Sequence, residues 1–89
     1  MVWRIEFTPD AGRDLDKLDP PVRRRILRFM LERVAHLQDP RSIGAALRGP
    51  QLGECWKYRV GDYSLICSIQ DDRLLILVLR IGNRREVYR

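Results

Sequence analysis

The amino-acid sequence predicts an α+β domain in which a helical hairpin packs on one face of a mainly antiparallel sheet. Three patterns carry this prediction: residues 2–7 alternate as a half-buried strand does, residues 9–37 hold apolar side chains at helical spacing, and residues 55–79 return to strand patterns. The expected order is an N-terminal strand, two helices and a three-stranded antiparallel meander. At 89 residues, the chain is expected to form one domain over residues 1–89.

The helical part is divided by two start signals. Thr8-Pro9 puts a hydroxyl at the N-cap and a proline at the first helical position, and Asp19-Pro20 repeats the pattern. The first helix should end near residue 18 and the second near residue 37. The apolar stripe of the second helix should face the core, and its other side is basic, with Arg23, Arg24, Arg25, Arg28 and Arg33.

The stretch from Glu54 to Gln70 predicts a β-hairpin around which the rest of the chain is organised. Gly61-Asp62 is a two-residue connection with glycine first, which suits a type II′ turn. This turn places Arg59 opposite Ser64, and paired residues share a face of the sheet. The apolar face should hold Trp56, Tyr58, Val60, Tyr63, Leu65 and Cys67. The opposite face should hold Lys57, Arg59 and Ser64, which form a small, open basic platform.

The segments on either side of this hairpin predict a loop and a buried strand. Residues 41–53 are rich in glycine and predict a loop with a turn of helix around Ile43 to Leu47. After a second turn at Asp71-Asp72, the apolar run from Leu74 to Leu79 predicts a strand that is covered on both faces. The closing segment from Arg80 to Arg89 follows this buried strand directly, so the position at which it leaves the sheet should be fixed.

The composition favours a polyanionic partner and a cytoplasmic location. The formal net charge is +5, and the excess is mostly arginine, which suits bidentate phosphate contacts; ordinary solubility is the alternative. No apolar run is long enough to span a bilayer and no secretory segment precedes the first strand, so no membrane contact is expected. Cys55 and Cys67 should lie on opposite faces without forming a disulfide, which suits a reducing compartment.

The side chains available for chemistry are lysine, arginine and tyrosine. The acids lie mostly at caps and turns, no Cys/His spacing indicates a metal, and His36 falls near the end of an arginine-rich helix. This inventory fits cleavage of RNA by its own 2′-hydroxyl, which needs a base, charge for the phosphorane and an acid, but no cofactor. Lys57 is suited to the role of the base, because the like charge of the neighbouring Arg59 disfavours protonation of the lysine. The alternative is that both side chains only solvate an exposed strand.

The chain resembles the RelE branch of the RelE/ParE superfamily of bacterial toxins, the toxic half of type II toxin–antitoxin pairs. The resemblance covers nearly the whole length. It is carried by the strand–helix–helix opening, the LRG motif at 47–49, the WKYRVGDYSLI hairpin at 56–66 and the closing IGNRREVYR at 81–89. It implies a ribosome-dependent endoribonuclease that cuts mRNA in the A site, without metal or cofactor, and that is held inactive by an antitoxin wrapped around its surface.

The resemblance also implies roles for individual residues. Lys57 would be the general base, and Arg59 would bind the phosphate and disfavour the charged form of Lys57. Arg84 would stabilise charge or protonate the leaving group. Tyr88 would stack on a base and orient it; the alternative is a core tyrosine that seals the sheet edge. Arg48 and Arg85 would contact RNA. Alternatively, Arg48 would serve as a structural anchor.

The sequence departs from the resemblance at one position of the platform. Many relatives carry an arginine on the phosphate where this chain has Ser64, directly after Gly61-Asp62-Tyr63. By the predicted register, the missing charge would lie opposite Arg59. Loss of one transition-state donor typically lowers a rate about 10²–10³-fold. Ser64 is therefore expected to attenuate cleavage.

Two other functions are compatible with the sequence. A ParE-like relative would poison DNA gyrase and catalyse nothing, and a plain basic binding module would not be toxic. The combination of Lys57, Arg84 and Tyr88 favours the nuclease, whereas Ser64 weakens that preference.

Either toxin implies a cognate antitoxin, expected to be RelB-like. It should carry an acidic, partly helical segment that docks on the platform, the arginine-rich helix or the hairpin edge, or displaces the tail at 84–88. The other expected partners are the ribosome and its mRNA. Operator DNA would be contacted only through the antitoxin.

Overall fold

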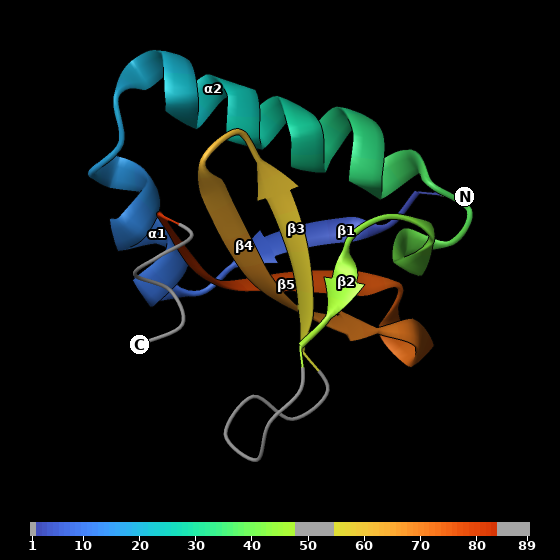
Figure 1. Ribbon diagram of the computed structural model, residues 1–89. Coiled ribbons are helices and arrows are strands. Elements are labelled where there is room, and N and C mark those ends of the chain that lie inside the picture. Colours follow the sequence, from blue (N-terminus) through green and yellow to red (C-terminus); the bar gives the residue numbers. More distant parts are fainter. Residues whose placement is uncertain (1, 48–54, 84–89) are drawn as a thin grey trace.

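The computed structural model describes residues 2–47 and 55–83, in which two helices lie across one face of a five-stranded sheet (Figure 1). This is the α+β architecture that the sequence predicts. In chain order the main elements are β1 (Arg4–Phe7), α1 (Pro9–Asp16), α2 (Pro20–Arg28), β2 (Ala45–Ala46), β3 (Trp56–Val60), β4 (Tyr63–Gln70) and β5 (Leu75–Asn83). Short helical turns lie at Phe29–Arg33, Val34–His36, Pro40–Ser42 and Asp71–Arg73.

α1 begins where the sequence predicts. The Thr8 hydroxyl accepts a hydrogen bond from the Ala11 N–H at 3.1 Å and donates one to the Leu79 carbonyl at 2.8 Å. The same side chain therefore caps the helix and holds it against β5. α1 ends at Asp16, slightly earlier than predicted. At the start of α2, Asp19 occupies the N-cap position, but its side chain makes no capping hydrogen bond.

The second helix changes type along its length. A π-helical turn at Phe29–Arg33 and a 3₁₀ turn at Val34–His36 follow α2 directly, so the helical path ends close to the predicted residue 37. π-helical turns occur frequently at functional sites. Along this path Ile26, Met30 and Val34 are fully buried in the core.

The strand order is β1-β5-β4-β3-β2. β3, β4 and β5 form the predicted antiparallel meander. β1 lies at one edge and pairs in parallel with β5, from Arg4 beside Leu75 to Phe7 beside Val78. Parallel neighbours require a long crossover, which the helices and the other strands provide between β1 and β5.

The turn of helix predicted at residues 43–47 is wrong. Residues 45–46 instead form β2, which pairs antiparallel with the start of β3. Gly44 has a φ of +85°, which lets the chain lie close to β3. The Trp56 indole N–H donates to the Ile43 carbonyl at 2.8 Å. These contacts with β3 replace the local hydrogen bonds that a helical turn would make.

The β3–β4 hairpin has the predicted register. Arg59 lies opposite Ser64, and Lys57 lies opposite Ile66. In the turn, only Gly61 has a positive φ, +59°, as a type II′ turn requires at its first central position.

The core lies between the helices and one face of the sheet. It contains the apolar face predicted for the hairpin, namely Trp56, Tyr58, Val60, Tyr63, Leu65 and Cys67. β5 adds Ile76, Val78 and Ile81. Both cysteines are free thiols, Cys55 half-buried and Cys67 buried. Among the described residues, no helix is long and apolar enough to cross a bilayer.

A β-bulge interrupts β5 near its end. The register of β4 against β5 shifts between Ile66 and Cys67, so Leu79 has no partner on β4. Val78 and Ile81 both belong to the core, although their odd spacing would put them on opposite faces of a regular strand. The extra residue therefore lets β5 contribute to the core on both sides of the bulge.

Candidate functional site

Lys57 and Arg59 lie two residues apart on β3 and point to the face of the sheet opposite the helices. The whole length of β3 is paired with β4, and the first two residues of β3 are also paired with β2. The backbone beneath both side chains is therefore fixed. Arg59 is exposed, whereas Lys57 is half-buried.

The third residue of the predicted platform is not open to solvent. Ser64 lies opposite Arg59 as predicted, but it is only 1% exposed. Ile66, on the same face of β4, is also buried. β4 is an interior strand with neighbours on both sides. The alternation of side chains along the hairpin predicts which residues share a face of the sheet, but it does not predict whether solvent reaches that face. The platform is thus reduced to Lys57 and Arg59.

Several predicted site residues lie outside the described residues: Arg48, Arg84, Arg85 and Tyr88. β5 ends at Asn83, the residue before the first arginine of the closing segment. Ser64 pairs with Arg59 on one side and with Gly82 on the other. Neighbouring strands lie about 4.8 Å apart, so Gly82 lies about 10 Å from Arg59. The end of β5 and the basic part of β3 therefore occupy the same region of the sheet.

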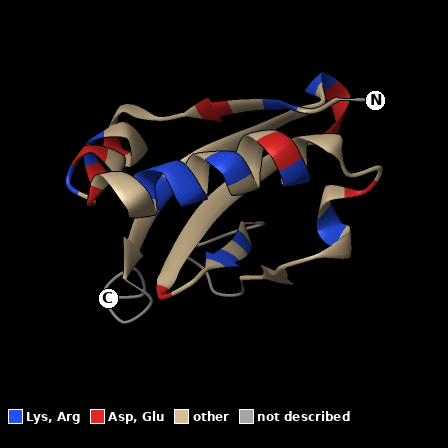
Figure 2. Ribbon diagram, turned by 90° about the horizontal axis from the view of Figure 1, so that it is seen from above, with Lys and Arg blue, Asp and Glu red and all other residues tan. Residues whose placement is uncertain are grey.

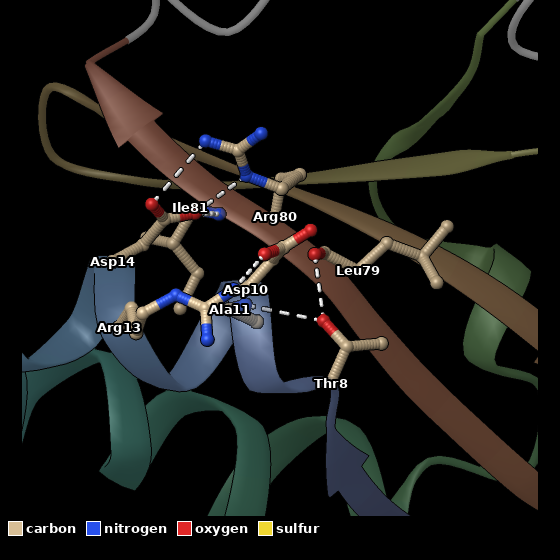
Figure 3. A network of polar contacts seen from close by, with 8 residues as sticks. All are labelled: Thr8, Asp10, Ala11, Arg13, Asp14, Leu79, Arg80 and Ile81. Carbon is tan, nitrogen blue, oxygen red and sulfur yellow. Dashed lines mark hydrogen bonds and ion pairs between the residues drawn. The ribbon is translucent and has the colours of Figure 1, made fainter.

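A polar network on α1 holds the end of β5 (Figure 3). The Asp14 carboxylate accepts hydrogen bonds from the Ile81 N–H and from Arg80 Nε, both at 2.9 Å. β1 pairs with β5 only as far as Val78, so Asp14 takes the place of a strand partner beside Ile81. This contact was not predicted from the sequence, because Asp14 and Ile81 are 67 residues apart and no local pattern links them.

The pKa of Asp14 lies below its ordinary value. Partial burial by itself acts to raise this pKa. The hydrogen bonds from Arg80 and Ile81, together with the positive charges of Arg80 and Lys17, outweigh the effect of burial. The carboxylate is therefore ionised near neutral pH, and the network is intact there.

A groove of about 450 Å³ separates α2 and its π-helical extension from the turn end of β3. It is lined by Arg25, Arg28, Phe29, Glu32, Arg33, Arg59, Val60 and Gly61. Four of these residues are arginines, and Glu32 is the one acid in this lining. Figure 2 shows basic residues along the length of α2. The sequence predicted the helix arginines and Arg59 as separate features, and the fold brings them to one groove.

Phe29 connects the groove with the core. Its ring packs edge-on against Tyr58 with the ring centroids 6.0 Å apart, and the Arg33 guanidinium lies 5.8 Å from its centroid. Arg28 and Glu32 approach to 3.7 Å, but both side chains are largely exposed, so their pairing neutralises little charge. The groove is therefore positive and has an aromatic wall.

The described residues offer positive charge and hydrogen-bond donors. Within residues 2–47 and 55–83, no group of three or more His, Cys, Asp or Glu side chains is arranged to hold a metal ion. Arginine pairs well with both phosphate and carboxylate groups. Lys57, Arg59 and the groove arginines thus suit an anionic ligand.

Comparison with known proteins gives a family. Residues 5–88 match the family described as the ParE toxin of the type II toxin–antitoxin system, parDE. The chain is 30% identical over 89 residues to Toxin RelG of Mycobacterium tuberculosis, and the alignment covers 100% of this chain and 99% of that toxin.

Solved structures agree with this result. The toxin–antitoxin complex RelBE2 of M. tuberculosis contains a chain with a TM-score of 0.83 and 28% identity, over 97% of this chain and 95% of that one. A variant of the E. coli toxin RelE in the free state has a TM-score of 0.76 and 27% identity, over 99% of this chain and 92% of that one. The chain therefore belongs to the ParE toxin family of type II toxin–antitoxin systems, within the RelE/ParE superfamily.

Proposed function

We propose that this toxin is a ribosome-dependent endoribonuclease that cuts mRNA in the ribosomal A site. The observation that carries the proposal is the position of Lys57 and Arg59 on one face of a strand held by its neighbours. The similarity to RelG and RelE toxins supports it, because the RelE branch that the sequence resembles consists of mRNA-cleaving toxins.

The reaction would use the 2′-hydroxyl of the RNA as the nucleophile. The Lys57 amine takes the 2′-proton while O2′ attacks the adjacent phosphorus, and the bond from phosphorus to O5′ breaks to leave a 2′,3′-cyclic phosphate. Arg59 stabilises the negative charge of the phosphorane. Arg84 protonates the departing O5′ or stabilises its charge, and Tyr88 stacks on a base and orients it. The last two roles rest on the resemblance.

The geometry of the sheet supports a site shared by β3 and the residues after β5. Gly82 lies two strands away from Arg59, at about 10 Å. The described end of β5 therefore lies in the region where Lys57 and Arg59 would hold the scissile phosphate. Arg48 and Arg85 are proposed as further contacts to the RNA backbone.

The expected partners follow from the family. A cognate antitoxin of the RelB type would hold the toxin inactive, which the RelBE2 toxin–antitoxin complex supports. The ribosome and mRNA would be the targets, in the cytoplasm. Operator DNA would be contacted only through the antitoxin.

A translation reaction with purified ribosomes, a defined mRNA and mapped RNA ends tests the proposal. Lys57→Ala should lower cleavage by at least about 10²-fold, because the general base is lost. Lys17→Ala is the matched control, since Lys17 is the other lysine of the chain and is exposed at the C-cap of α1. Equal cleavage by folded Lys57→Ala and wild-type protein would rule out the nuclease centre.

The second candidate is a ParE-like inhibitor of DNA gyrase without nuclease activity. Two observations favour it: the neutral Ser64 beside Arg59, and the family description, which names ParE. This candidate predicts that the purified chain blocks supercoiling of relaxed plasmid by gyrase and leaves ribosome-bound mRNA intact. In cells it predicts DNA-damage signalling and filamentation, whereas the nuclease predicts that translation stops first.

A further inference from the structure

α1 and its N-cap take the place of a strand along the last part of β5. β1 pairs with β5 only as far as Val78, and the register of β5 shifts at the unpaired Leu79. Beyond β1, the Thr8 hydroxyl donates to the Leu79 carbonyl at 2.8 Å, and the Asp14 carboxylate accepts from the Ile81 N–H at 2.9 Å (Figure 3). These two side chains therefore hold β5 on both sides of its bulge.

The Asp14 carboxylate is itself held in place. Its side chain is only 13% exposed, whereas that of Arg80, which binds it, is 60% exposed. Arg80 donates to it from Nε at 2.9 Å and from Nη2 at 3.4 Å. The bond to the Ile81 N–H thus comes from a partly buried, ionised group with a fixed position, and it ties the end of the strand to the helix.

The anchored part of β5 lies close to the proposed catalytic centre. Ile66 pairs with Lys57 on one side and with Arg80 on the other, so Arg80 lies two strands, about 10 Å, from the proposed base. β5 ends at Asn83, and Arg84 is the next residue of the sequence. The contact with α1 therefore fixes β5 directly before the residue that is proposed to act on the leaving group.

We propose that Asp14 is a positioning residue of the nuclease, which fixes the end of β5 relative to Lys57 by holding the Ile81 N–H. Asp14 itself would touch no RNA. The proposal rests on the proposed function for the reaction that it serves. Displacement of a catalytic group by about 1 Å can lower a rate about 10²-fold, so the loss of one hydrogen bond at this strand end would affect the chemistry as well as the stability of the fold.

Single-turnover cleavage of ribosome-bound mRNA, at a temperature where every variant is folded, tests the proposal. Asp14→Ala should lower the saturating rate at least about tenfold and leave the half-saturating toxin concentration within about threefold, because Lys57 and Arg59 still bind the RNA. Asp14→Asn keeps an oxygen that can accept from the Ile81 N–H, and it should recover most of the rate. Ile76→Val is the matched control and should cleave as the wild type does, because it removes a buried methylene group from the start of the same strand.

Amide hydrogen exchange followed by NMR measures the strand end without ribosomes. In Asp14→Ala, exchange at the Ile81 amide relative to the Val78 amide should rise at least about tenfold, because Val78 lies within the part of β5 that β1 pairs.

The outcomes separate this role from a structural one and from failure of the nuclease. An unchanged saturating rate in Asp14→Ala, an equal fall in Ile76→Val, or unchanged exchange at Ile81 would overturn the proposal. Failure of the nuclease would appear differently, as cleavage that Lys57→Ala does not change while exchange at Ile81 still rises in Asp14→Ala.

Discussion

The Asp14 carboxylate accepts a hydrogen bond from the backbone N–H of Ile81 at 2.9 Å and so joins α1 to the end of β5. The Arg80 guanidinium binds the same carboxylate. The Ile81 N–H lies beyond the reach of β1, which pairs with β5 only up to Val78. Asp14 therefore satisfies a partly buried backbone donor that the sheet leaves without a strand partner.

Replacement of Asp14 should destabilise the fold. Asp14→Ala removes the acceptor of the Ile81 N–H and is expected to lower the free energy of unfolding by about 1–3 kcal/mol. Asp14→Asn keeps an acceptor oxygen and should cost less. Urea unfolding followed by tryptophan fluorescence measures both. Asp16→Ala, at an exposed acid of the same helix, should stay within about 0.5 kcal/mol of the wild type; equal losses at both positions would contradict this role of Asp14.

The same network should make stability depend on acid pH. The pKa of Asp14 is lower in the folded chain than its ordinary value of 3.8, so its ionised form stabilises the fold above the unfolded pKa. This contribution is lost as the pH falls through the folded pKa. The Arg41 guanidinium lowers the pKa of Asp71 in the same way.

Unfolding curves between about pH 6 and about pH 3 measure this dependence. The wild type should lose more unfolding free energy over that range than Asp14→Asn, which cannot titrate at this position. Parallel pH profiles for the two proteins would show that Asp14 is not responsible.

Restoring the charge at position 64 should raise nuclease activity. Ser64→Arg places a guanidinium opposite Arg59 and beside Gly82, which has no side chain. Since one transition-state donor is typically worth about 10²–10³ in rate, cleavage should rise at least about tenfold. The measurement is ribosome-bound mRNA cleavage at equal concentrations of folded protein. Because Ser64 is buried, thermal unfolding must accompany it; a folded variant that cuts no faster would disprove attenuation by Ser64.

Two glycine substitutions should have opposite effects on stability. At Gly44 a side chain would overlap the Lys57 carbonyl oxygen and lie 2.6 Å from Trp56 Nε1, and the φ of +85° is itself unfavourable. Gly44→Ala should therefore cost at least about 1–3 kcal/mol. Gly12 lies within α1 with open space around its Cβ position, so Gly12→Ala should stabilise by about 0.5–1 kcal/mol. Urea midpoints that shift in the same direction would contradict this prediction.

Local signals explain which parts of the fold could be predicted. Thr8-Pro9 and Gly61-Asp62 specify a helix start and a hairpin turn through contacts within a few residues, and the structure confirms both. The apolar face of the hairpin follows from that turn, because each pair of opposite residues shares a face.

Long-range contacts explain which parts could not be predicted. β2 depends on the Trp56 indole bound to the Ile43 carbonyl and on the conformation of Gly44, neither of which a periodicity reveals. The burial of Ser64 depends on the place of β4 inside the sheet. The Asp14 network likewise joins distant segments, as does the convergence of the helix arginines with Arg59.

The unpaired residue Leu79 has a consequence for comparing this chain with its relatives. Without the extra residue, Val78 and Ile81 would be two positions apart and would lie on the core side of a regular strand, opposite Cys67 and Leu65. A relative that is one residue shorter at this point would therefore keep the same faces of its last strand. Alignments across this point should therefore allow a one-residue gap at Leu79 before amino acids are compared.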